Sequence, residues 1–211
     1  DGRELWTWIW PTPMANRFKG LTHEPAPQHA TATETTNTIE VKAGDLRVTF
    51  SKETGVLSEV RRGEQIFSLT NGPQFTGGTN SPTRITFAED GPDLVVTENF
   101  SGALQHVSWR VNGNGWVDCD YTYSATGSNE FLGVTFDYPE QNVRHKRWLG
   151  DGPYRVWKNR LRGVSLNVWD NDYNNTITGY KDWIYPEFKG CFANVRWLQL
   201  ETTEGPITVI N

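Results

Sequence analysis

Short stretches of alternating apolar and polar residues, separated by turn residues, fill the chain from residue 39 onward. Residues 39–50 read IEVKAGDLRVTF, in which two alternating stretches flank a Gly44-Asp45 turn. This period of two places apolar side chains on one face of a β-strand. Later stretches such as DLVVTENF and LQHVSWRVN repeat the pattern, and none shows sustained helical spacing. Many short strands joined by turns predict an all-β sandwich or barrel with almost no helix.

Three regions differ in composition. Residues 1–18 contain ELWTWIW, whose alternating tryptophans predict a strand, either from a preceding immunoglobulin-like domain or packed on the sandwich. Residues 19–38 combine threonine, alanine and proline without an aromatic residue, which is typical of an extended linker. Residues 39–211 then form the predicted β-domain. Within it, residues 71–82 (NGPQFTGGTNSP) have the composition of a loop.

Charge and hydropathy argue against two classes of partner. The net charge is −5, and the one basic cluster, at 144–147, is too short for a nucleic-acid footprint. No apolar stretch reaches the length of about 18 residues that a membrane-spanning helix needs. Ten tryptophans are far more than ordinary usage. Aromatic rings stack on sugar rings and also anchor protein interfaces, so composition leaves both open.

Catalytic and metal motifs are not found in the sequence. The histidines lack metal-ligand spacing, and Cys119 and Cys191 are expected to be buried thiols rather than a disulfide. No cofactor and no metal ligand are expected, although Asp170 and Asp172 could offer oxygen ligands to a cation. Glu187, between aromatic residues, is the best single acid for a raised pKa, but glycoside hydrolysis needs two carboxyl groups.

The stretch WLGDGP at 148–153 has two glycines and a proline in four residues. It lacks the lysine of a phosphate-binding loop, and Pro153 removes an amide donor. A tight irregular turn between strands is therefore expected, with Trp148 packed inward and Arg160 close to backbone carbonyls or Asp151.

This stretch, with Trp157 and Arg160 after it, resembles the W-x-G-x-G-P segment in the last domain of family 2 β-galactosidases. Downstream, YPE at 185–187, Gly190 and NVRWL at 194–198 are similar to that family's P-Q-E-x-G and D-V-R-W segments. The opening strands from residue 39 also resemble that domain. The residues that carry the family signature are Trp148, Gly150, Gly152, Pro153, Arg160, Pro186, Gly190, Arg196 and Trp197.

The resemblance implies a large antiparallel β-supersandwich, similar to galactose mutarotase, that is not catalytic itself. Both catalytic glutamates of the family lie on a TIM barrel upstream in the same polypeptide. The expected role is a scaffold with a carbohydrate-facing surface, and the expected ligand is a galactose-containing oligosaccharide or polysaccharide. Periplasmic or secreted localisation follows from this class of enzyme. The candidate carbohydrate-facing residues are Arg155, Trp157, Trp183, Tyr185 and Glu187.

The chain departs from the family pattern at several points. Arg155 and Asn159 stand where the family has Glu and Asp, and the loop after residue 71 lacks the family's R-A-P-x-D-N-D segment. Two alternatives therefore stay open. One is a stand-alone carbohydrate-binding module. The other is a mutarotase-like sugar epimerase, in which His106 or His145 would act as acid and Glu187 as base.

Overall fold

A computed structural model describes residue 2 and residues 24–26, 28–128, 132–157, 159, 161–172 and 190–211. Strands in antiparallel sheets make up nearly all regular structure there, which confirms the all-β prediction. Across these ranges, the helical content is one 3-10 turn, η1 (Glu140–Asn142), and no helix is long and apolar enough to cross a membrane. The chain divides into two compact units, residues 16–139 and residues 140–211 with 1–15.

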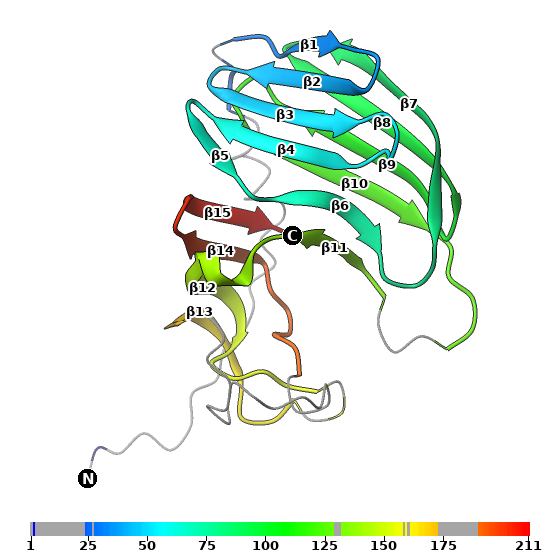
Figure 1. The fold of residues 1–211 in the computed structure, drawn as a ribbon. Helices are drawn as coiled ribbons and strands as arrows, with labels where there is room; N and C mark the ends of the chain where they lie inside the picture. The colour runs from blue at the N-terminus through cyan, green and yellow to red at the C-terminus, as the bar shows by residue number, and fades with distance from the viewer. Residues whose placement is uncertain are drawn as a thin grey trace. The chain divides into compact units, whose positions relative to one another are not determined.

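The unit of residues 16–139 contains two sheets (Figure 1). The first has the order β1-β2-β3-β4-β6-β11, with β5 paired to β4. Its strands are β1 (Thr31–Glu34), β2 (Thr38–Ala43), β3 (Leu46–Ser51), β4 (Leu57–Arg62), β5 (Gln65–Phe67), β6 (Thr70–Phe75) and β11 (Val134–Asp137). The second has the order β10-β9-β8-β7, built from β7 (Asn80–Asp90), β8 (Asp93–Gly102), β9 (Leu104–Val111) and β10 (Val117–Tyr123).

Alternation along the strands builds the core between these sheets. On β2 and β3 every second side chain is buried, as the period-two pattern predicts. Phe50 of the first sheet meets Trp109 of the second, with ring centroids 5.4 Å apart. Burying each large apolar side chain contributes roughly 1.5–3 kcal/mol relative to leaving it exposed. The buried set includes Ile39, Val41, Val48, Phe50, Leu57, Leu94, Val96, Leu104, Val107, Trp109 and Val111.

Two segments of this unit differ from the sequence expectations. Part of the predicted linker forms β1, which pairs with β2, and Ala30 before it is buried. The loop predicted at 71–82 is shorter than expected: residues 76–79 connect the two strands, but β6 runs to Phe75 and β7 begins at Asn80, so the rest of the stretch is strand. Gly72 is there for close packing, since a Cβ at this position would fall on the Phe136 ring. From the sequence alone, a glycine required for close packing cannot be distinguished from a glycine required for a turn.

The second unit contains one sheet with the order β13-β12-β14-β15. Its strands are β12 (Val143–Gly152), β13 (Ser165–Asp172), β14 (Trp197–Thr202) and β15 (Gly205–Ile210), all antiparallel. The stretch WLGDGP is not the tight turn expected from the sequence. Its first five residues end β12, the strand that pairs with both β13 and β14.

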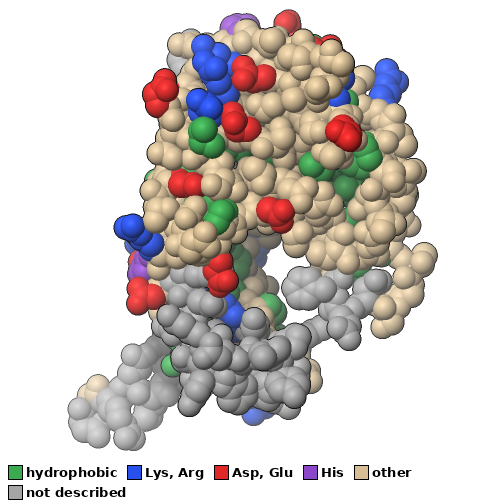
Figure 2. All heavy atoms as spheres, viewed as in Figure 1, with side chains coloured by type: hydrophobic (Ala, Val, Ile, Leu, Met, Phe, Trp, Pro, Cys, Tyr) green, Lys and Arg blue, Asp and Glu red, His purple; other side chains and the backbone are tan. Residues whose placement is uncertain are grey.

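The surface of the first sheet carries charges of both signs. Ion pairs join Lys52 to Glu34 at 2.6 Å, Arg61 to Glu59 at 3.5 Å and Arg62 to Asp45 at 3.5 Å. On the face shown in Figure 2, Lys and Arg side chains lie among Asp and Glu side chains. Exposed pairs of this kind contribute little stability, about 0–1 kcal/mol each.

Candidate functional site

The glycines of the signature stretch let neighbouring backbone and rings approach β12. A Cβ on Gly150 would lie 2.9 Å from the Cα of Val195, and a Cβ on Gly152 would collide with the Trp169 ring. The Asp151 carboxylate accepts a hydrogen bond from Asn194 Nδ2 at 2.8 Å. These residues therefore build the sheet of the second unit.

Trp148 packs on Phe192, the ring that two cationic side chains also contact. Its side chain is buried, with 1% of the residue exposed, and its ring centroid is 4.5 Å from that of Phe192. Arg155 Cζ lies 5.5 Å and Lys146 Nζ 5.6 Å from the centroid of the Phe192 ring. Burial, and then the charge of Arg155, lower the pKa of Lys146 to about 8, against the attraction of Asp172. Arg155, a predicted sugar contact, thus contacts the packing aromatic of its own unit.

The other signature residues of the second unit are placed as follows. Gly190 has φ +58° and would meet the Val156 carbonyl with a Cβ, so both conformation and space favour glycine. Trp157 is half-buried and follows Val156, which forms a bridge with Cys191. Pro153 and Trp197 are half-buried, and Arg196 is exposed. Arg160, Trp183, Tyr185, Pro186 and Glu187 lie outside the described residues.

Asp170 and Asp172, considered above as cation ligands, bind a histidine instead. His145 Nε2 contacts Asp170 Oδ1, and His145 Nδ1 lies 3.3 Å from Asp172 Oδ1. The hydrogen bond to Asp170 is the main cause that raises the pKa of His145. Over the described part of the chain, no group of three or more His, Cys, Asp or Glu side chains is arranged to hold a metal ion.

The proposed epimerase pairs receive no support from the placement of the histidines. His145 is engaged by the two aspartates, and His106 Nδ1 lies 3.0 Å from Asn99 Oδ1. Both cysteines are free, but Cys191 is exposed, so the expectation of two buried thiols is wrong for that residue.

A carboxyl group with a strongly shifted pKa lies inside the sandwich. Glu98 on β8 is 0% exposed, and burial raises its pKa to about 8 against the lowering effect of the neighbouring Trp109. Neither carboxyl oxygen, nor the nearby Trp109 Nε1, has a hydrogen-bond partner among the described residues. Burial, with the nearby Glu98 and Asp120, also raises the pKa of the Cys119 thiol to about 12. Because Glu98 has no access to the surface, it cannot contact a polymeric substrate.

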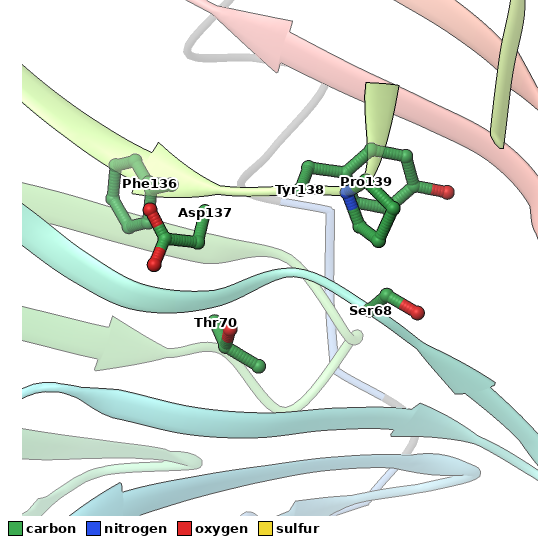
Figure 3. Close-up of a pocket in the computed structure, with 6 residues that line it drawn as sticks. All are labelled: Ser68, Thr70, Phe136, Asp137, Tyr138 and Pro139. Atoms are coloured by element: carbon green, nitrogen blue, oxygen red, sulfur yellow. The ribbon is translucent and has the colours of Figure 1, made fainter. Parts of the chain in front are cut away.

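An open pocket of about 660 Å³ lies where the β5–β6 connection meets the end of β11. Figure 3 shows the side chains that line it: Ser68, Thr70, Phe136, Asp137, Tyr138 and Pro139. Thr70 and Asp137 are partners in the register of β6 and β11, so strand pairing fixes their relative position. Figure 3 shows Tyr138 beside Pro139, and Phe136 beside Asp137. The pocket therefore combines aromatic rings, hydroxyl groups and one carboxylate.

Hydrogen bonds hold the carboxylate of this pocket. Asn71 Nδ2 donates to Asp137 Oδ2 at 2.8 Å, and Gln74 Nε2 donates to Asn71 Oδ1 at 3.2 Å. Asn71 has φ +54°, in the left-handed region that asparagine tolerates better than most residues. The backbone of β6 thus presents Asn71 to Asp137.

A second aromatic surface lies on β10, at the edge of its sheet. Tyr121 and Tyr123 are 38% and 44% exposed, and their rings are stacked with centroids 6.3 Å apart. Tyr123 also packs on Phe75, at 4.7 Å between centroids. Such exposed rings offer apolar faces for stacking.

No protein-family model matches the chain, and a search of curated proteins finds no significant match.

The pocket residues were not singled out from the sequence. Residues 136–139 read FDYP, an acid between two aromatic residues at the end of a predicted strand. That pattern marks the segment as unusual, but Ser68 and Thr70 come from a connection more than 60 residues earlier, and the sequence does not indicate this pairing. The long-range register of β6 with β11 decides the site.

Proposed function

We propose that the chain is a non-catalytic β-sandwich domain of a family 2-type glycoside hydrolase, similar to the last domain of β-galactosidases. It serves as a scaffold and presents a carbohydrate-facing surface. The catalytic TIM barrel would precede it in the same polypeptide, and the enzyme would be periplasmic or secreted. The ligand would be an oligosaccharide or polysaccharide, with galactose as the sugar that the family resemblance suggests.

The open pocket at Phe136–Pro139 is the observation that carries this proposal. Sugar sites combine aromatic rings, which pack on the apolar face of a pyranose, with a few polar groups that fix its orientation. This pocket offers Phe136, Tyr138, two hydroxyl side chains and a carboxylate in one open site. The exposed Tyr121–Tyr123 pair on β10 adds a second stacking surface in the same unit.

The arrangement of carboxyl groups supports a binding role over a catalytic one. Glycoside hydrolysis uses two carboxyl groups roughly 5–10 Å apart around the scissile bond. Among the described residues, one carboxylate, Asp137, lines the pocket. Glu98 has a pKa suited to a general acid, but it is sealed in the core.

Calorimetric titration of the chain with neutral oligosaccharides, including galactosides, tests the binding role. We expect saturable binding that Tyr138→Ala weakens up to about tenfold, since packing on one aromatic ring contributes up to about 1.5 kcal/mol. Phe87→Ala is the matched control, because Phe87 is an exposed aromatic (37%) on β7. Equal losses in both variants, or no binding to any sugar, would contradict the proposal.

Aryl-glycosides test the non-catalytic role. We expect no turnover above background, and hydrolysis that persists through repurification would show that the chain is an enzyme. A stand-alone carbohydrate-binding module would share the binding result. The reading frame upstream of Asp1 distinguishes the two, because only the hydrolase domain requires a TIM barrel there.

A further inference from the structure

The fixed orientation of Asp137 bears on which sugars the pocket accepts. Asn71 donates to one carboxylate oxygen, Oδ2, at 2.8 Å, and Gln74 in turn holds Asn71. An ionised carboxylate has about four acceptor positions on its two oxygens. One bond from Asn71 therefore leaves Oδ1 and further lone pairs free to accept hydrogen bonds from a ligand.

Hydrogen-bond donors on the ligand would occupy the remaining acceptor positions of the Asp137 carboxylate. Hydroxyl groups of a pyranose both donate and accept, so one hydroxyl can donate to Asp137 while it or its neighbour accepts from the hydroxyl of Thr70. A charge-assisted hydrogen bond to a carboxylate is about twice as strong as a neutral one. The aromatic residues Phe136 and Tyr138 provide apolar contact for the ring.

Asp137 is exposed and is the one charged side chain among the described residues that line the pocket. The ion pairs found among the described residues all lie elsewhere in the chain and leave Asp137 uncompensated. A sugar carboxylate or sulfate in this pocket would face Asp137 without a balancing cation among the described lining residues, and the two negative charges would repel each other.

We propose that this pocket selects uncharged sugar rings and that Asp137, oriented by Asn71, is the residue that excludes acidic sugars. This inference rests on the carbohydrate-binding role proposed above. The expected ligands are neutral hexopyranosides rather than uronic acids or sulfated sugars. The Asp137 side chain is the group responsible for this selectivity.

A matched pair of ligands tests the selectivity. Methyl β-galactopyranoside and the corresponding methyl galacturonoside differ in one carboxylate, and saturation-transfer NMR or calorimetry gives both dissociation constants. For the wild-type chain we expect the acidic sugar to bind at least about tenfold more weakly. The difference should shrink as salt is raised from about 0.01 to 1 M, because the Debye length falls from about 30 to 3 Å.

Asp137→Asn is the decisive variant, since it removes the charge and keeps the shape and a carbonyl acceptor. We expect it to lose some affinity for the neutral sugar, because the hydroxyl donors lose a charge-assisted acceptor, and to reduce the preference for the neutral over the acidic sugar about tenfold. Asp120→Asn on β10 is the control, because Asp120 is exposed and lies outside the pocket lining. It should leave both affinities unchanged.

The outcomes separate this inference from the proposed function. If the wild-type chain binds both sugars equally, or if Asp137→Asn leaves the preference unchanged, the selectivity is wrong and the binding role stands. If neither sugar nor any longer neutral oligosaccharide binds, the proposed function fails and the selectivity fails with it. Should Asp137→Asn lower the melting temperature strongly, the salt dependence of the wild-type preference still decides, because a preference of steric origin would not respond to salt.

Discussion

At the scale of single residues, Glu98 is the group with the least favourable surroundings. Its neighbours along β8, such as Val96, belong to the apolar core, and the alternation of the strand turns Glu98 toward the same interior. An ionised carboxylate there would lose its hydration without a hydrogen-bonding partner among the described residues. The protein avoids this by keeping Glu98 protonated at neutral pH.

The raised pKa of Glu98 gives a stability that depends on pH. The unfolded chain releases this proton near the ordinary value of 4.5, and the folded chain holds it until about 8. Below pH 4.5 the protonated Glu98 makes its full contribution to the free energy of unfolding. Between pH 4.5 and pH 8 that contribution falls by up to about 1.4 kcal/mol per pH unit, and above pH 8 it no longer changes. Glutamine at position 98 cannot ionise. From pH 5 to pH 8 the free energy of unfolding of Glu98→Gln, measured with urea, should therefore rise by about 2–4 kcal/mol relative to that of wild type. The exposed Glu53→Gln should show no such gain, and parallel curves for Glu98→Gln and wild type would contradict the assignment.

Gly72 leaves space for the ring of Phe136, one of the residues that line the pocket. A methyl group at position 72 would fall on the Phe136 ring, so Gly72→Ala should overpack this contact and cost about 1–3 kcal/mol in urea unfolding. Gly133→Ala is a matched control in the same region, because no atom lies within 4 Å of its added Cβ. Similar effects of the two changes would show that close packing is not the reason for glycine at 72.

At the scale of strands, the sequence predicted elements well where a strand has one buried face. The alternating stretches at 39–50, 93–100 and 104–111 match β2, β3, β8 and β9 because burial imposes the period of two. The prediction failed where glycine serves packing, at β6 and at the end of β12. The pocket could not be foreseen because it needs the register of β6 with β11, which local pattern does not encode.

Within the second unit, Trp148 on β12 should dominate stability. It is 1% exposed, packs on Phe192 and donates a hydrogen bond to the Asp151 carbonyl at 3.2 Å. Trp148→Ala should therefore cost about 3–5 kcal/mol in denaturant unfolding. Val168→Ala on the paired strand β13, where the side chain is 43% exposed, should cost less than about 0.5 kcal/mol. A fully stable Trp148→Ala that lost only sugar binding would reassign this residue to the ligand site.

At the scale of the whole chain, the described residues form two compact units with separate packing centres. Phe50 and Trp109 lie in the core of residues 16–139, and Trp148 and Phe192 lie in the other unit. Units that each have their own buried side chains can unfold separately. The family resemblance instead led to the expectation of one domain over residues 39–211.

Differential scanning calorimetry should accordingly resolve two transitions. Leu94→Ala, at a site that is 1% exposed, should cost about 2–5 kcal/mol and lower one transition. Trp148→Ala should lower the midpoint temperature of the other transition and leave that of the first transition unchanged. A single transition that both changes shift would show that the units unfold as one.

The position of β15 has a practical consequence for anyone who purifies this chain. Among the described strands β15 pairs on one side only, with β14, and its sequence GPITVI contains no charged residue. Val209 on it is 54% exposed. Natural edge strands limit self-association with charged side chains and proline, and β15 has Pro206 near its start but no charge along the rest of the strand. A lysine at position 209 should therefore delay aggregation in concentrated samples, because it places a charge where a second copy would otherwise add its own strand.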